Sequence, residues 1–156
     1  MEPRLTHVDE HGAARMVDVG DKEVTAREAT ATGRVLVSAE VIALLRGAGV
    51  PKGDALGVAR IAGIMGAKRT PDLIPLCHPI AISGVRLDLA VHDDAVAITA
   101  RVRTTDRTGV EMEALTAVAV AGLTVIDMVK AVDPAAVITD VRVEAKSGGK
   151  RGEWVR

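Results

Sequence analysis

Four charged side chains mark the two ends of one long apolar segment. Glu111 and Glu113 stand at its beginning and Asp127 and Lys130 at its end, and the residues between are apolar or glycine apart from two threonines. If the segment is one α-helix, a rise of about 1.5 Å per residue places Glu113 roughly 20 Å from Asp127, with both on the same side. One pocket cannot easily use both ends, so we expect pockets that repeat across an oligomer.

Each end of the segment allows a catalytic and a structural interpretation. Carboxylates in the first turn of a helix suit its macrodipole, which would account for Glu111 and Glu113 without chemistry. An acid in the last turn opposes that dipole, although Asp127 and Lys130 are spaced for a surface ion pair. The apolar residues that flank Asp127 predict instead that it is partly buried, where its pKa could suit acid–base catalysis.

A proline-rich loop carries a second set of side chains, Leu76-Cys77-His78-Pro79. A histidine beside a proline is held on a stiff backbone and can face a ligand while it titrates near neutral pH, or it can hydrogen-bond loop carbonyls. Cys77 and His78 are adjacent and the chain has one cysteine, so a tetrahedral metal site is not predicted. Cys77 alone is typical of a small buried side chain.

Basic residues in loops or beside expected helices form a third group: Lys22, Arg27, Lys52, Lys68, Arg69, Lys146, Lys150 and Arg151. Lys52 precedes an expected helix N-terminus, which favours anions, and the glycines between Lys146 and Lys150 offer a flexible backbone nest. Neither a Walker A loop nor a GxGxxG fingerprint occurs. Each cation alone is typical of solvated surface, but together they indicate a polyanionic small-molecule ligand.

The elements that position these residues are predicted from periodicity. Small and β-branched residues predict a strand at 24–37, with a break near Gly33. Hydrophobic alternation predicts strands at 85–91, 96–102 and 137–145, of which the first two form a hairpin. Helices capped by Ser38 and Asp54 run to about 46 and 69, and a third helix covers the long apolar segment, 110–132. Three prolines predict irregular structure at 71–79.

This order of elements predicts an α+β fold, a ferredoxin-like split β-α-β sandwich with an antiparallel sheet and helices on one face. Alternating strands favour an antiparallel sheet over an all-parallel one. We expect a flexible N-terminal arm at 1–21, a single domain at 22–146 and a flexible basic tail at 147–156. The second helix is rich in Ala and Gly, which predicts close packing against another backbone.

Composition narrows the class of protein. The chain has 156 residues, 48% of them hydrophobic, but one Trp and no Phe or Tyr, so a core of small aliphatic side chains is expected, which favours a homo-oligomer. A net charge of −1 argues against a general nucleic-acid binder. We recognise no signal peptide and no membrane span. One cysteine suits a reducing compartment, so a cytoplasmic protein is predicted.

Four stretches, at 16–33, 52–80, 109–133 and 145–152, closely resemble the cyclic pyranopterin monophosphate synthase family, and AKRTPDLIPLCHP and GVEMEALTA are their most specific parts. The resemblance implies a lyase of molybdenum cofactor biosynthesis that converts 3′,8-cyclo-7,8-dihydro-GTP to cyclic pyranopterin monophosphate and releases pyrophosphate. It implies a homohexamer, a trimer of dimers with active sites at subunit interfaces, and an upstream radical cyclase as functional partner. No cofactor and no metal are expected.

The resemblance also implies roles for the residues at matching positions. Asp127 and Lys130 would be central to catalysis, with Lys52 and Glu111 close by. Substrate contacts would come from Leu76, Cys77, His78, Met112 and Glu113, and the triphosphate would meet Lys22, Arg27 and Lys146. Ring opening, imine formation and recyclisation need proton transfers, which we assign to Asp127 and Lys130, with Lys52 as an acid.

Two other classes of protein remain open. A non-catalytic nucleotide-binding regulatory module would bind the same ligand without releasing pyrophosphate. A scaffold that only delivers an intermediate between enzymes has no need of Asp127 at an apolar helix end, so it ranks last.

Overall fold

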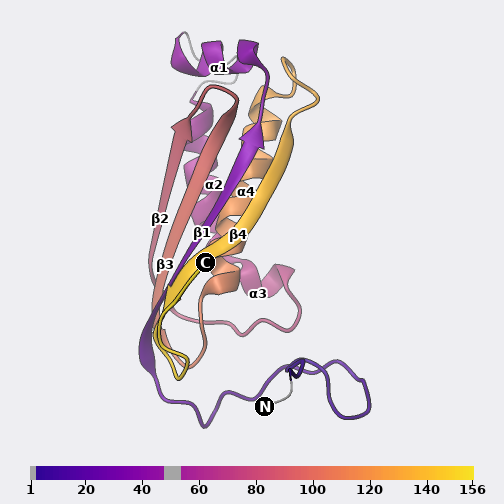
Figure 1. Cartoon of the computed structure of the whole chain (residues 1–156), viewed down its shortest axis with the longest axis vertical. Coiled ribbons are helices and arrows are strands. Elements are labelled where there is room, and N and C mark those ends of the chain that lie inside the picture. The colour runs from indigo at the N-terminus through magenta and orange to yellow at the C-terminus, as the bar shows by residue number, and fades with distance from the viewer. Residues whose placement is uncertain (1–2, 48–53) are drawn as a thin grey trace.

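The computed structural model describes residues 3–47 and 54–156, in which strands and helices follow the predicted order. The strands are β1 (Thr25–Leu36), β2 (Ile82–Val91), β3 (Ala95–Asp106), β4 (Val137–Ser147) and β5 (Trp154–Val155). The helices are α1 (Ala39–Arg46), α2 (Ala55–Lys68), α3 (Thr70–Leu73) and α4 (Glu111–Val129) (Figure 1). The sequence did not predict α3 and β5, and the other elements are confirmed.

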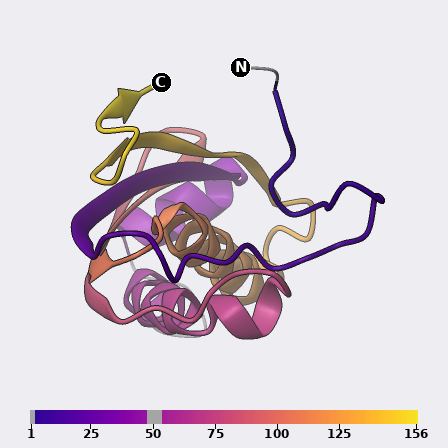
Figure 2. The ribbon, with the colours of Figure 1, turned by 90° about the horizontal axis from the view of Figure 1, so that it is seen from below.

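The strands form one antiparallel sheet in the order β2-β3-β1-β4-β5. The central strand β1 pairs with β3 from Thr25 opposite Asp106 to Leu36 opposite Ala95, and with β4 along its other edge. Figure 2 shows the two layers, with α2 and α4 together against one face of the sheet. This is the predicted ferredoxin-like α+β arrangement with helices on one face.

The central strand continues through Gly33, so the break predicted there is wrong. Pairing with β3 is unbroken at this residue, and only the register with β4 shifts, between Thr32 and Arg34. A Cβ on Gly33 would lie 2.6 Å from Cγ1 of Val118 on α4. The glycine therefore permits a close approach of helix and sheet and does not end the strand.

The long helix α4 packs on the sheet and beside α2, so it is the core helix of the domain. A Cβ on Gly63 of α2 would lie 2.8 Å from the carbonyl oxygen of Ala117, which confirms the predicted close packing of this helix against another backbone. By length and composition α4 is also the one described helix that could cross a membrane. Most of its apolar window is buried within the domain, as core helices are.

Side chains cap α1 and α2 where the sequence predicts them. Ser38 and Asp54 each accept a hydrogen bond from a backbone amide in the first turn. The irregular structure predicted for 71–79 is partly wrong, because Pro71 lies in the first turn of α3. The missing N–H of a proline costs no helical hydrogen bond at that position.

The N-terminal arm lies at the bottom of Figure 1, and the C-terminus lies near the middle of the view. Residues 3–21 form a mostly exposed arm with one isolated bridge, between Val8 and Ala14. After β4 the chain turns back, and β5 pairs with it so that Trp154 lies opposite Lys146. The limits of the domain and the flexibility of its two end segments stay predictions.

Candidate functional site

An ion pair joins the beginning of α4 to the end of β4. Lys146 Nζ donates a hydrogen bond to Oε1 of Glu111 over 2.9 Å, and the two side chains are 31% and 29% exposed. Burial alone would raise the pKa of Glu111, but hydrogen bonds from Lys146 and the backbone, with the charges of Lys146 and Arg27, lower it below its ordinary value. Glu111 is therefore an ionised acceptor in a first helical turn, where the macrodipole favours it.

A groove of about 520 Å³ opens beside this ion pair. Its cationic lining residues are Lys22, Arg27, Lys146, Lys150 and Arg151, and its acidic ones are Glu23, Glu28 and Glu111. The guanidinium of Arg27 is held in place because its Nε donates to the carbonyl of Asp106 over 3.0 Å and its Nη2 to that of Arg107 over 3.2 Å. Five cations against three acids, one of which already has a lysine partner, suit a polyanionic ligand.

A glycine-rich turn after β4 forms one wall of this groove. Gly148 and Gly149 have φ angles of 91° and 73°, a region that favours glycine. A Cβ on Gly148 would collide with the carbonyl of Ala26, and one on Gly149 with the guanidinium of Arg27. Glycine at both positions lets the turn lie directly against β1 and Arg27.

Cys77 and Glu113 form a second contact at the same end of α4. The Cys77 thiol donates to Oε1 of Glu113 over 3.7 Å, and Glu113 is 1% exposed. Within the described residues, Oε2 of Glu113 has no hydrogen-bond partner. Burial and the charge of Glu111 raise the pKa of Glu113, and burial and the charge of Glu113 raise the pKa of Cys77 to about 11. Cys77 is therefore a protonated donor near neutral pH and a poor nucleophile.

The remaining predicted substrate contacts lie near this pair but outside the groove lining. His78 places Nε2 2.5 Å from the carbonyl oxygen of Val17, which is the structural use of the imidazole that the sequence left open. Leu76 is half-buried, and Met112 is 37% exposed in the first turn of α4. In the part of the chain that the structure describes, no cluster of three His, Cys, Asp or Glu side chains could hold a metal ion.

The predicted partial burial of Asp127 is wrong for the single chain. Lys130 Nζ donates to Oδ1 of Asp127 over 2.7 Å, and the two side chains are 58% and 56% exposed. At about 100° per residue, Val125 and Val129 share the inward side of α4 and Asp127 projects from the other, so the apolar neighbours do not cover it.

The predicted catalytic residues are thus not brought together within one chain. Glu111 lies at the lower end of α4 in Figure 1, beside the groove, and Asp127 and Lys130 lie at the upper end, roughly 20 Å along the axis. Lys52 lies outside the described residues. The structure gathers Glu111 with Lys22, Arg27 and Lys146, and it separates this group from Asp127.

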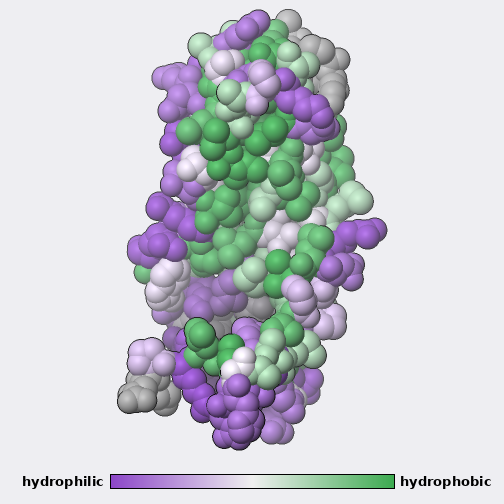
Figure 3. All heavy atoms as spheres, turned by 90° about the vertical axis from the view of Figure 1, so that its right-hand side faces the viewer, coloured by the Kyte–Doolittle hydropathy of each residue, from purple (hydrophilic) through white to green (hydrophobic). Residues whose placement is uncertain are grey.

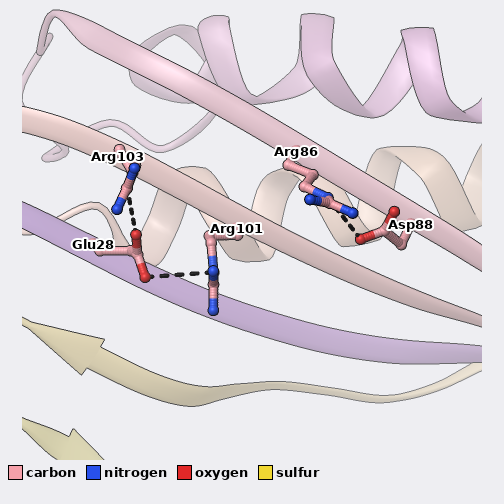
Figure 4. A network of polar contacts seen from close by, with 5 residues as sticks. All are labelled: Glu28, Arg86, Asp88, Arg101 and Arg103. Carbon is pink, nitrogen blue, oxygen red and sulfur yellow. Dashed lines mark hydrogen bonds and ion pairs between the residues drawn. The ribbon is translucent and has the colours of Figure 1, made fainter.

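Two acidic residues of the groove, Glu23 and Glu28, were not singled out from the sequence, and Lys150 and Arg151 were named there only as members of the cation group. Glu28 also lies on the sheet face opposite the helices, where its carboxylate bridges Arg103, at 2.5 Å, and Arg101, at 3.4 Å (Figure 4). The two cations follow the glycines of the turn, so their charge and spacing were visible in the sequence. The chain turns back after these two cations because β5 pairs with β4, and a strand of two residues is too short to be predicted from the sequence.

Fold and groove together define a small α+β domain with a cation-rich groove at one end of its strands. The chain matches the MoaC family over residues 16–149 and belongs to it. It is 77% identical over 155 residues to a protein of Streptomyces coelicolor named cyclic pyranopterin monophosphate synthase, covering 99% of this chain and 91% of that protein. A Nocardioides protein of the same name is 75% identical over 156 residues, covering 98% and 96%. Cyclic pyranopterin monophosphate synthase 2 of Mycobacterium tuberculosis is 60% identical over 152 residues, covering 97% and 91%.

Proposed function

We propose that this chain is a cyclic pyranopterin monophosphate synthase of molybdenum cofactor biosynthesis. It converts 3′,8-cyclo-7,8-dihydro-GTP to cyclic pyranopterin monophosphate and releases pyrophosphate. Membership of the MoaC family and the shared name of relatives at 60–77% identity support this activity. The observation on the molecule itself that carries the proposal is the groove with five cations.

The groove suits the triphosphate of this substrate. Lys22, Arg27 and Lys146 supply positive charge near the oxygens that become negative when pyrophosphate leaves, which is the main electrostatic requirement of that step. Because Lys146 is already paired with Glu111, substrate binding redistributes this ion pair, and Glu111 can then accept a proton or a substrate hydrogen bond. No cofactor or metal takes part in this scheme.

Ring chemistry is assigned to the other end of α4. Asp127 and Lys130 exchange protons with the purine-derived ring, and Lys52 acts as an acid. Since the groove and this pair lie at opposite ends of one helix, a complete site combines the beginning of α4 from one protomer with the end of α4 from another. Cys77, His78, Met112 and Glu113 contact substrate beside the groove.

The outer surface of the domain is consistent with such an assembly. Exposed apolar side chains gather on the side formed by α4 and β4, where Figure 3 shows a broad hydrophobic band, and they include Leu123, Val137 and Val141, which are 60%, 50% and 37% exposed. A surface of this kind marks an interface. We propose a homohexamer, a trimer of dimers, located in the cytoplasm and supplied by a radical cyclase.

Turnover of the cyclic dihydro-GTP substrate tests this function. Purified protein should release pyrophosphate and form cyclic pyranopterin monophosphate in equal amounts, with both products followed by chromatography. Tight binding of the substrate without pyrophosphate would contradict the proposal and favour a nucleotide-binding regulatory module. Absence of both binding and turnover would remove the groove as the substrate site.

A further inference from the structure

The last residues of the chain form a clasp on the edge of the sheet. Backbone pairing joins Trp154 to Lys146 and Val155 to Ala145, and the amide of Arg156 donates to the carbonyl of Glu144 over 2.9 Å. This clasp, residues 154–156, therefore adds a short last strand to the sheet beside β4. The chain between β4 and the clasp is closed into a short loop whose two ends are both fixed.

Arg156 adds two side-chain contacts to the clasp. Its Nε donates to the carbonyl of Val143 over 2.9 Å, and its guanidinium carbon lies 5.6 Å from the centre of the Trp154 ring. Such a cation–π contact contributes about 0.5–1 kcal/mol at an exposed site. The tryptophan is 41% exposed and lines a smaller cleft of about 260 Å³, which shares Glu28, Lys146 and Ser147 with the groove, but it does not line the groove itself.

The loop closed by the clasp, drawn in yellow in Figure 2, contains Lys150 and Arg151, and both residues line the groove. Gly152, with φ 62°, donates its amide to the carbonyl of Gly149 over 3.2 Å, which tightens the loop between the two cations and β5. Glycines fold easily into other conformations, so without fixed ends these two cations would sample a wide volume.

We propose that Trp154 and Arg156 are positioning residues: they hold Lys150 and Arg151 where these cations bind the phosphates of the groove ligand. The inference rests on the proposed polyphosphate-binding role of the groove. It assigns the clasp a role in ligand affinity and none in proton transfer, because neither clasp side chain lines the groove.

Binding of inorganic triphosphate, measured by calorimetry on the full-length oligomer, tests this role. Trp154→Ala should raise the Kd for triphosphate roughly three- to tenfold, as expected for the loss of one or two exposed charge contacts. With the cyclic dihydro-GTP substrate the same variant should raise KM and leave kcat within about twofold. Trp154→Phe should restore most of the affinity, because it retains a ring beside Arg156.

A double-mutant cycle shows whether the clasp acts through the loop cations. In a Lys150→Ala/Arg151→Ala background, Trp154→Ala should have no further effect on the Kd. Val155→Ala is the matched control, because this side chain is 75% exposed and the backbone pairing is retained; it should bind as wild type. An unchanged Kd for Trp154→Ala, or an equal loss in both backgrounds, overturns the proposal. If wild-type protein does not bind triphosphate at all, the groove assignment itself fails.

Discussion

Glu113 and Asp127 lie on one helix, yet the first is 1% exposed at its beginning and the side chain of the second is 56% exposed near its end. The helix separates them by roughly 20 Å. Each has different partners: Glu113 accepts a hydrogen bond from Cys77 in the interior, and Asp127 accepts one from Lys130 at the surface. The separation is the structural reason to expect a site shared between protomers.

Asp127→Asn should fold and assemble as wild type but lose turnover by about 100-fold or more, the usual contribution of a general acid or base. The asparagine keeps the shape of the side chain and loses its capacity to accept a proton. Asp88→Asn is a matched control, since Asp88 is 61% exposed and pairs with Arg86 at 3.2 Å far from α4. Pyrophosphate release measures both, and retained activity in Asp127→Asn would remove Asp127 from the mechanism.

Glu113→Gln should change how stability depends on pH. The folded-state pKa of Glu113 is raised above 4.5, so its proton favours the folded state below that pH, and this contribution is lost as pH rises through the folded pKa. Glutamine cannot ionise. The melting temperature of Glu113→Gln should equal that of wild type near pH 4 and exceed it by a few degrees at pH 8. A change of 1 kcal/mol in the free energy of unfolding shifts the melting temperature of a protein of this size by about 2–4 °C.

Thermal melts at one protein concentration check this prediction. Glu40→Gln, an exposed glutamate in the first turn of α1, controls for the substitution itself. If the difference in melting temperature between wild type and Glu113→Gln stays constant from pH 4 to pH 8, burial does not raise the pKa of Glu113.

Gly63→Ala should lower the free energy of unfolding by about 1–2 kcal/mol. The added Cβ would lie 2.8 Å from the carbonyl of Ala117, and this overpacking costs more than the roughly 1 kcal/mol gained in helix propensity. Gly84→Ala is the control, because a Cβ there meets nothing within 4 Å. Denaturant unfolding measures both, and an equal effect of the two substitutions would refute the close crossing of α2 and α4.

Alternation, capping residues and turn signals were sufficient to predict the sheet, α1, α2 and α4. These signals are local, so they fail where contacts with a distant part of the chain determine the local structure. Gly33 looked like a strand break because the sequence does not show that Val118 approaches it. The strand β5 is two residues long and depends on pairing with β4, which short windows do not reveal.

The candidate site was predictable in its residues and less so in its geometry. Charge and spacing marked Lys22, Arg27 and Lys146, and the structure brings them together because β1 and β4 are neighbours in the sheet. The burial of Asp127 was inferred from its apolar neighbours, although they occupy the opposite side of the helix. Helical angle, rather than proximity in sequence, decides which residues share a side.

The shared site is tested most directly by co-expressing two inactive variants, Lys146→Ala and Asp127→Asn. The first variant is defective in the groove, and the second is defective near the end of α4. In a two-fold dimer whose sites combine one chain's groove with the other's Asp127, every mixed dimer contains one site with both ends intact. Random pairing makes half of the dimers mixed, so the mixture should regain about a quarter of wild-type pyrophosphate release.

Each variant expressed alone is the control and should stay inactive. Mixing the two purified proteins without subunit exchange should also restore nothing. Recovery near a quarter of wild-type activity on co-expression is the result that we predict. No recovery, with mixed oligomers verified by mass spectrometry, would contradict the account, because it would place a complete site within a single chain.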